Sequence, residues 1–149
     1  MHPRLREILE TLNTISDPDE RAGMLIDYAA RFREVPHDIA QRPFPPGNRV
    51  SYCESEAYVW AVEQPDHTLK LYFAVENPSG ISAKALAVIL DRALSGLPPE
   101  EFADIPQDIV ERIFRRNISM GKGMGLISLV QMVQHLAQQY VQAHKASSA

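Results

Sequence analysis

The sequence predicts an α+β fold in which a small antiparallel sheet of about three strands carries helices packed on one face. Two observations support this prediction. Apolar residues recur at helical spacing near both ends of the chain, and they alternate with polar residues over two short runs in the middle. The 149 residues are expected to form one domain, 1–149, which is long enough to bury a core without disulfides.

Two helices are expected at the start of the chain. The run "PRLREILETLNTI" (3–15) opens with a proline, which suits the first turn of a helix. A second helix is expected within 16–35, with Asp17 as its N-cap, Pro18 at its first position and Pro36 ending it. The apolar stripe of this second helix is expected to consist of Ala22, Leu25, Ile26, Ala29 and Phe32.

The middle of the chain is expected to form the sheet. The segment "HDIAQRPFPPGN" (37–48) contains three prolines and predicts an extended connection. Residues 56–63 and 69–76 then alternate between apolar and polar side chains, with a turn between them, which indicates an antiparallel hairpin with one face on the core. The apolar face of the first run is expected to contain Tyr58, Trp60 and Val62, and that of the second run Leu69, Leu71, Phe73 and Val75. A short strand over 49–53 would complete a three-stranded sheet.

Helices are expected again in the C-terminal half. Ser82 can cap the first of them and Gly96 can end it. A glycine-rich loop, "SMGKGMG" (119–125), is expected before the last one. The predicted helices lie near 83–94, 99–104, 106–115 and 124–143.

Composition excludes several classes of function. The net charge of −4 argues against a nucleic-acid surface, which needs clustered lysine and arginine. No apolar run approaches the roughly 18 residues of a membrane span, and the N-terminus lacks an apolar signal core. A single free cysteine fits the reducing cytoplasm. The histidines and the cysteine are not at metal-ligand spacing, so we expect neither a metal nor another cofactor.

Two further motifs give weak signals. The chain has no G-x-S-x-G, but a cysteine hydrolase that uses Cys53 with His37, His67 or His135 stays open as an alternative. The run "GKGMG" (121–125) lacks the P-loop pattern. We expect it to be a flexible turn that lets two helices pack closely, with partner contact or anion binding as the alternative.

Cys53 is the only cysteine, and it lies where irregular chain becomes strand, in "NRVSYCESEAYVWA" (48–61). It is either a buried apolar residue or a reactive thiol. A lone thiol can carry sulfur as a persulfide, because a second cysteine would discharge it into a disulfide. Glu54 and Glu56 disfavour the thiolate, and Arg49 offsets them in part. The pattern therefore favours an acceptor thiol activated by a partner over a free-standing enzyme.

This stretch resembles the SufE family, the sulfur-acceptor proteins of iron–sulfur cluster assembly. The segment "RAGMLIDYAARFREVP" resembles the family's second helix with the proline after it. The segments "PQDIVERIF" and "GMGLISLVQMV" resemble its paired C-terminal helices. The residues that carry the resemblance around the cysteine are Asn48, Val50, Cys53, Ser55, Val59 and Trp60.

Three positions depart from the family pattern. Tyr52 replaces the glycine before the cysteine, which makes the loop bulkier. Cys53 is two residues further from Trp60, and an even insertion keeps Trp60 on its original face because strand side chains alternate with period two. Lys122 replaces an arginine, so the charge is kept without the fork geometry.

The resemblance implies a role for Cys53 as a persulfide acceptor. A pyridoxal-phosphate-dependent cysteine desulfurase would supply the sulfur, and an iron–sulfur scaffold would receive it. Tyr52, Glu54 and Lys122 are expected to contact the partner. The chain itself is expected to need no cofactor.

The persulfide is expected to be sheltered at rest, because it is easily reduced or oxidised in solvent. Apolar neighbours such as Tyr52, Tyr58 or Trp60 are expected to cover it. Two alternatives remain at this point. The chain could be a regulatory module that docks a desulfurase without carrying sulfur, or a thiol-dependent hydrolase, which would need an imidazole within hydrogen-bond reach of Cys53.

Overall fold

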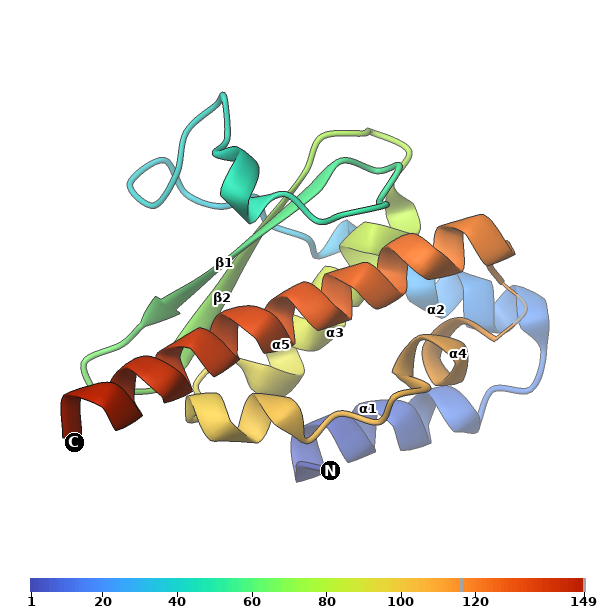
Figure 1. Cartoon of the computed structure of the whole chain (residues 1–149). Helices are drawn as coiled ribbons and strands as arrows, with labels where there is room; N and C mark the ends of the chain where they lie inside the picture. Colours follow the sequence, from blue (N-terminus) through green and yellow to red (C-terminus); the bar gives the residue numbers. More distant parts are fainter. Residues whose placement is uncertain (116, 149) are drawn as a thin grey trace.

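An antiparallel hairpin separates a layer of helices from an irregular segment in the computed structural model, which describes residues 1–115 and 117–148. Helices lie on one side of the hairpin and the chain before β1 lies on the other (Figure 1). The elements are α1 (Pro3–Asn13), α2 (Pro18–Ala30), the 3₁₀ turn η1 (Pro46–Asn48), β1 (Ala57–Glu63), β2 (Leu69–Val75), α3 (Ile81–Leu94), the 3₁₀ turn η2 (Pro99–Ala103), α4 (Ile109–Phe114) and α5 (Met120–Ser148).

Both faces of the sheet are covered. Val59 and Phe73 are partners in the register, and both belong to the main core that the helices cover. Trp60 lies on the opposite face, in a second cluster with Val35, Phe44 and Ala74. The aromatic rings of Phe44 and Trp60 meet edge to face with centroids 5.2 Å apart. The predicted core face is confirmed for β2, where Leu69, Leu71, Phe73 and Val75 belong to the main core. For β1 the predicted apolar face is wrong, because Tyr58 and Trp60 pack on the far side while Val59 faces the main core. The proline-rich segment (37–48) covers that far side.

Arg42 fastens the proline-rich segment to the sheet. Its guanidinium donates to the carboxylates of Glu34 and Glu76, with Nε–Oε1 and Nη2–Oε1 distances to Glu76 of 3.0 and 2.6 Å. The hydrogen bond to Glu34, and to a smaller extent the one to Glu76, raises the pKa of Arg42. Glu76 directly follows β2, so this clamp ties the segment to the end of the strand.

The predicted third strand is wrong. Within the described residues the sheet has two strands, and 49–53 contributes only a single bridge between Arg49 and Tyr58. The physical reason lies in the backbone, because Tyr52 and Glu56 have φ of +58° and +52°. These left-handed residues turn the chain out of the extended conformation before a strand can form.

The second helix also differs from prediction at its end and on its buried face. It stops at Ala30, six residues before Pro36, because Val35 N–H donates to Phe73 O (2.8 Å) and holds the chain at the sheet. Ile26, expected on the buried face, is 53% exposed, whereas Arg21 is buried. Asp17 occupies the N-cap position, but its side chain makes no capping hydrogen bond.

The two long C-terminal helices begin earlier than predicted. Gly80 is the N-cap of α3, so Ser82 lies inside its first turn. The run "GKGMG" is the start of α5 and not a loop. Ser119 explains this, because its carbonyl accepts from Gly123 N–H (3.0 Å) and its hydroxyl from Lys122 N–H (3.3 Å), as a capping serine does.

Candidate functional site

Cys53 lies on a short loop, residues 51–56, that we call the cysteine loop. Val50 N–H donates to Ala57 O (2.9 Å), so the chain leaves the sheet and returns at almost the same point. Inside the loop, Glu56 N–H donates to Cys53 O (3.1 Å). The segment after β2 adds a bond from Asn77 N–H to Ser55 O (3.1 Å). The backbone around the thiol is thus tied to both strands of the hairpin.

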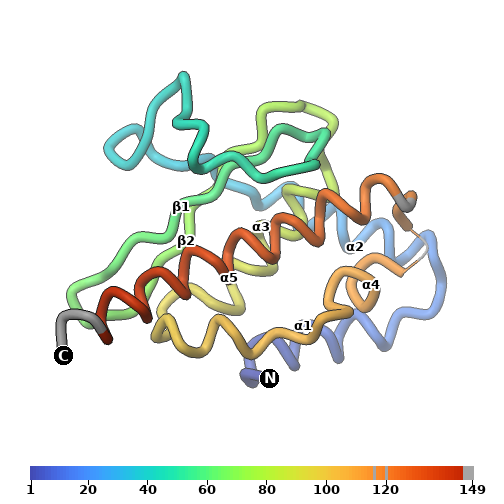
Figure 2. Tube along the Cα trace, viewed as in Figure 1, coloured from blue at the N-terminus to red at the C-terminus, as the bar shows by residue number. Residues whose placement is uncertain are grey.

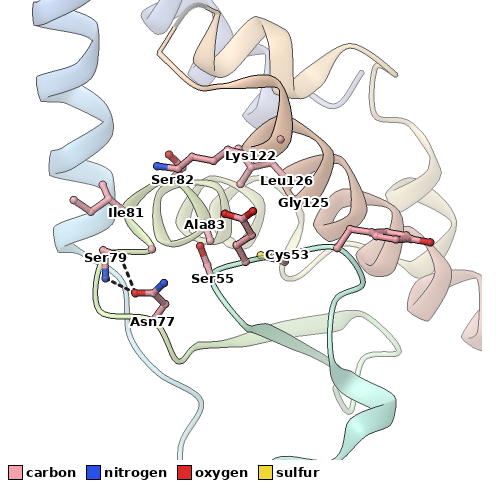
Figure 3. A pocket seen from close by; sticks show the side chains of 14 residues that line it. Cys53, Ser55, Asn77, Ser79, Ile81, Ser82, Ala83, Lys122, Gly125 and Leu126 are labelled. Atoms are coloured by element: carbon pink, nitrogen blue, oxygen red, sulfur yellow. Dashed lines mark hydrogen bonds between the residues drawn. The ribbon is translucent and has the colours of Figure 1, made fainter.

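The free thiol is half-buried and faces a small pocket of about 130 Å³. Figure 2 shows the cysteine loop and the chain after β2 at the same end of the hairpin, above the start of α5. The pocket lies where these segments meet (Figure 3). The share of liquid volume taken by one water molecule is about 30 Å³, so the pocket has room for an added sulfur atom. Its wall residues are Tyr52, Cys53, Glu54, Ser55, Asn77, Ser79, Gly80, Ile81, Ser82, Ala83, Gly121, Lys122, Gly125 and Leu126.

Two glycines let the neighbouring helices approach the cysteine loop. A Cβ on Gly125 would lie 2.9 Å from Tyr52 O and 3.0 Å from Cys53 Cα. A Cβ on Gly80 would lie 2.7 Å from Val75 Cγ1 and 3.0 Å from the Ser55 side chain. Such distances are shorter than ordinary carbon contacts. The loop is therefore seated between the starts of α3 and α5. A side chain at Gly80 would displace the Val75 side chain, and one at Gly125 would displace the backbone of the cysteine loop.

Helix ends and two charged side chains set the electrostatic character of the pocket. Both α3 and α5 begin at it, and a helix N-terminus carries partial positive charge that stabilises an anion. Within the described residues, the backbone N–H groups of Ser82 and Ala83 have no hydrogen-bond partner, and both residues line the pocket. Lys122 adds a positive charge and Glu54 a negative one. The pocket can therefore hold a negatively charged sulfur despite the nearby carboxylate.

The structure brings together all four residues that the sequence singled out. Tyr52, Glu54 and Lys122 line the pocket with Cys53, and all three are exposed. Tyr52 is 79% exposed, an unusual state for a large aromatic side chain. Arg49 lies on the other side of the loop, in a second hollow beside Cys53 and Glu54.

Exposed apolar side chains line this pocket and occur next to its lining residues along α5. Tyr52 and Ile81 line it, and Met124 and Ile127 precede and follow its lining residues Gly125 and Leu126 in α5. Their exposed fractions are 79%, 46%, 57% and 43%. Large apolar side chains gathered in this way mark surfaces that contact other proteins.

The prediction that Tyr52, Tyr58 or Trp60 covers the thiol is wrong. Tyr52 points into solvent, while Tyr58 and Trp60 belong to the cluster on the far face of the sheet. The cover instead comes from Gly125 and Leu126 at the start of α5. Sequence reasoning missed these residues and Gly80 as parts of the site. The signal for Gly125 and Leu126 was the glycine-rich run "GKGMG" with the leucine after it, for which the sequence predicts a flexible turn.

The hydrolase alternative finds no support at the pocket, since no histidine is among its lining residues in the described part of the chain. His67 lies at the hairpin turn and has φ of +67°, with its ring 5.5 Å from that of His144. Among the described residues, no group of three or more histidine, cysteine or acidic side chains could hold a metal ion. The same residues include no helix with the length and apolarity to span a membrane.

Comparison with known proteins places the chain in a family. The model of a family described as "SufE: Fe-S metabolism associated domain" matches residues 6–137. No curated protein matches the chain. Among solved structures, it is similar to the solution structure of a hypothetical protein from Thermus thermophilus, with a TM-score of 0.72 and 24% identity over 95% of this chain and 98% of that chain. This structural likeness supports the fold alone.

The fold and the pocket define a small α+β protein that presents one half-buried thiol beside the starts of two helices. The chain belongs to the SufE family, whose domain is associated with iron–sulfur metabolism.

Proposed function

We propose that this protein is a sulfur carrier, and that Cys53 accepts persulfide sulfur from a pyridoxal-phosphate-dependent cysteine desulfurase and passes it to an iron–sulfur assembly scaffold. The observation that carries the proposal is the half-buried thiol on the cysteine loop, facing a pocket with two free backbone N–H donors among the described residues. Membership of a family associated with iron–sulfur metabolism supports it. A free thiol of this kind is suited to the reducing cytoplasm, where we place the protein.

The reaction is a thiol–persulfide exchange. The Cys53 thiol loses its proton, and its Sγ attacks the outer sulfur of the donor's persulfide. A new S–S bond forms on Cys53 while the donor's S–S bond breaks, and the donor cysteine leaves as a thiolate that takes up a proton. One neutral sulfur atom moves, so no outside oxidant or reductant is needed.

The residues of this chain position and shelter the product. The outer sulfur of a persulfide on Cys53 carries negative charge, and the unpaired N–H groups of Ser82 and Ala83 in the first turn of α3 can stabilise it. Gly125 and Leu126 limit access of solvent from the α5 side. Delivery requires the cysteine loop to move away from them, and the donor must approach over the exposed rim that includes Tyr52 and Lys122.

Mass spectrometry of the intact protein tests the proposal. After incubation with the desulfurase of its own organism and cysteine, we expect an adduct of about 32 Da, one sulfur atom, on Cys53. We also expect faster cysteine turnover by the desulfurase. Neither effect should occur with Cys53→Ser. A protein that gains no sulfur and leaves turnover unchanged would rule out the carrier role.

One observation favours a second function, a docking regulator that carries no sulfur. The apolar rim around the pocket could bind a desulfurase whether or not the thiol reacts. The same Cys53→Ser variant separates the two functions. A regulator would still change the turnover of its partner with serine at position 53, while a carrier would not.

A further inference from the structure

The outer edge of β2, the edge away from β1, is closed at both ends by hydrogen bonds from other parts of the chain. Exposed strand edges invite pairing with other chains, and proteins cover them for that reason. Four bonds provide the cover here: Leu69 N–H to Leu97 O (3.1 Å), Gly96 N–H to Leu69 O (2.9 Å), Leu71 N–H to Ser95 Oγ (3.0 Å) and Val35 N–H to Phe73 O (2.8 Å).

Between these bonds, two backbone groups remain open. In an antiparallel pair, alternate residues direct their N–H and C=O groups toward the partner strand and away from it. Leu71 N–H and Phe73 C=O bond to groups outside the sheet, so Leu71 C=O and Phe73 N–H lie on the same outer edge. Neither has a hydrogen-bond partner anywhere in the described part of the chain. Most backbone groups of buried residues are paired, so two adjacent open groups call for an explanation.

These open groups face a preformed groove with a volume of about 530 Å³. Its floor is the edge of β2 from Lys70 to Phe73, one wall is α3 with Val88 and Arg92, and the other wall is the chain that follows α2. Phe32 and Tyr72 are half-buried in it, so the groove offers apolar surface beside the open backbone. This combination fits an extended peptide better than a small ion.

The rim of the groove is positively charged. Four cationic residues line it, Arg31, Arg33, Lys70 and Arg92, against the two acidic residues Glu34 and Asp91. Both acids are already engaged, Glu34 with Arg42 and Asp91 with Lys70 (2.5 Å).

The arginines of the rim are therefore left without carboxylate partners among the described residues. Arg92 lies over the Tyr28 ring (5.6 Å), which leaves its N–H groups available. Arg31 and Arg33 form no ion pair within that part of the chain. A positive groove on a chain of net charge −4 points to an acidic occupant.

We infer that this groove binds an extended, acidic segment of a partner protein, which forms one backbone hydrogen-bonded pair with β2 opposite Tyr72. The residue opposite Tyr72 donates its N–H to Leu71 O and accepts from Phe73 N–H, while its acidic neighbours meet Arg31, Arg33 and Arg92. The inference goes beyond sulfur transfer and does not use Cys53. Ala83 lines the Cys53 pocket, and Ala87 and Arg92 line the groove about 6 and 14 Å further along α3, so one partner can occupy both sites.

A labelled peptide of about ten residues, alternating glutamate and valine, tests this binding mode on the full chain. We expect saturable binding that weakens at least about tenfold between about 50 and 300 mM salt. Hydrogen exchange at the Phe73 amide should slow by about tenfold or more when the peptide is bound. The same peptide with an N-methyl group on every residue cannot donate to Leu71 O and should bind far more weakly.

Substitutions in the protein test how much the positive rim contributes to peptide binding. Arg31→Glu/Arg33→Glu should lower affinity by about tenfold or more, while Arg31→Lys/Arg33→Lys should stay within about threefold of the parent. Arg112→Glu/Arg115→Glu, the same charge change in the last turn of α4 and at its C-cap, should leave binding unchanged. Equal binding of the N-methylated peptide or of oligoglutamate, an unprotected Phe73 amide, or no binding would each overturn the inference. Cys53→Ser should bind normally, so failure of the carrier proposal does not affect this test.

Discussion

Gly125 and Cys53 are in contact at the backbone level, because a Cβ on Gly125 would lie only 3.0 Å from Cys53 Cα. The start of α5 therefore rests on the cysteine loop without any side chain between them. The absence of a side chain at position 125 is what allows this close contact.

Gly125→Ala should push the cysteine loop away from α5. We expect the Cys53 thiol to react with iodoacetamide at least about threefold faster than in the parent, because the loop opens more often. Gly121→Ala is the matched control, since it lies one turn earlier in the same helix and a Cβ there meets nothing within 4 Å. Both variants replace a helical glycine with alanine, which favours the helix. An unchanged alkylation rate in Gly125→Ala would show that the glycine does not seat the loop.

Tyr52 is held in the left-handed region, with φ of +58°, although its side chain is 79% exposed. This conformation costs about 1–2 kcal/mol for a residue with a Cβ, and glycine avoids the cost but adds entropy to the unfolded chain. We expect Tyr52→Gly to be about 0.5–1 kcal/mol more stable than Tyr52→Ala in denaturant unfolding. Should the two variants unfold alike, the strain at this residue would be negligible.

If Tyr52 contacts the desulfurase, both variants should lose stimulation to the same degree. That outcome would separate the role of the ring in docking from the role of the backbone in the loop. A loss confined to one of them would mean that loop conformation, and not the ring, controls the partner.

Arg21 is buried at 2% exposure and joins three helices. Its guanidinium donates to Ile113 O (3.1 Å), to Leu12 O and to Arg112 O, carbonyls near the ends of α1 and α4. Burial, and secondarily the charge of Arg115, lowers the pKa of Arg21, but an arginine stays protonated at any ordinary pH. It therefore acts as a permanent cation at two helix C-termini.

Arg21→Met should cost about 3 kcal/mol or more, because three carbonyls near helix ends lose their donor. The loss should be the same at about pH 6 and about pH 8, since the group does not titrate there. Arg31→Met, at the end of the same helix and exposed, should change the free energy of unfolding by less than about 0.5 kcal/mol. A similarly small change in Arg21→Met would contradict the role of Arg21 in connecting the three helices.

Asp66 stabilises the hairpin turn when its carboxyl group is ionised. Its carboxylate accepts from Thr68 Oγ1 (2.6 Å) and Thr68 N–H (3.2 Å), and these bonds lower the pKa of Asp66. A depressed folded-state pKa means that the unfolded chain binds the proton more readily. The stabilisation is then present above the unfolded-state pKa of about 4 and is lost as the pH falls through the folded-state value.

The stability advantage of the parent over Asp66→Asn should therefore shrink between about pH 6 and about pH 3 in thermal or urea unfolding. Asp38→Asn, another exposed aspartate, controls for the loss of one negative charge. An advantage that stays constant over this range would mean that the Thr68 bonds do not depend on the charge of Asp66.

Much of the fold could be predicted from the sequence because the helices and strands follow from local patterns of apolar, polar and proline residues. The alternation in 56–63 and 69–76 predicted β1 and β2 to within one residue at each end. Proline at the first helical position placed the starts of α1 and α2. The errors occurred where a distant contact overruled the local pattern, as when Phe73 O took Val35 N–H and ended α2 early.

The candidate site was predictable only in part. The lone Cys53, with Tyr52 and Glu54 beside it, could be singled out because they are adjacent in the sequence. Their common pocket with Lys122 and Ser82 could not be derived, since it depends on how the starts of α3 and α5 pack against the cysteine loop. The same holds for the groove at β2, whose open backbone groups are visible only after every hydrogen bond of the edge is assigned.

The amino-acid sequence by itself determined the helices, the hairpin, the family and the single thiol, because each follows from spacing or identity along the chain. Only the tertiary structure decided what surrounds that thiol and which edge of the sheet stays open. The physical reason is that cover, charge and unpaired backbone groups arise from contacts between segments, such as Gly125 against Cys53, that lie far apart in the sequence.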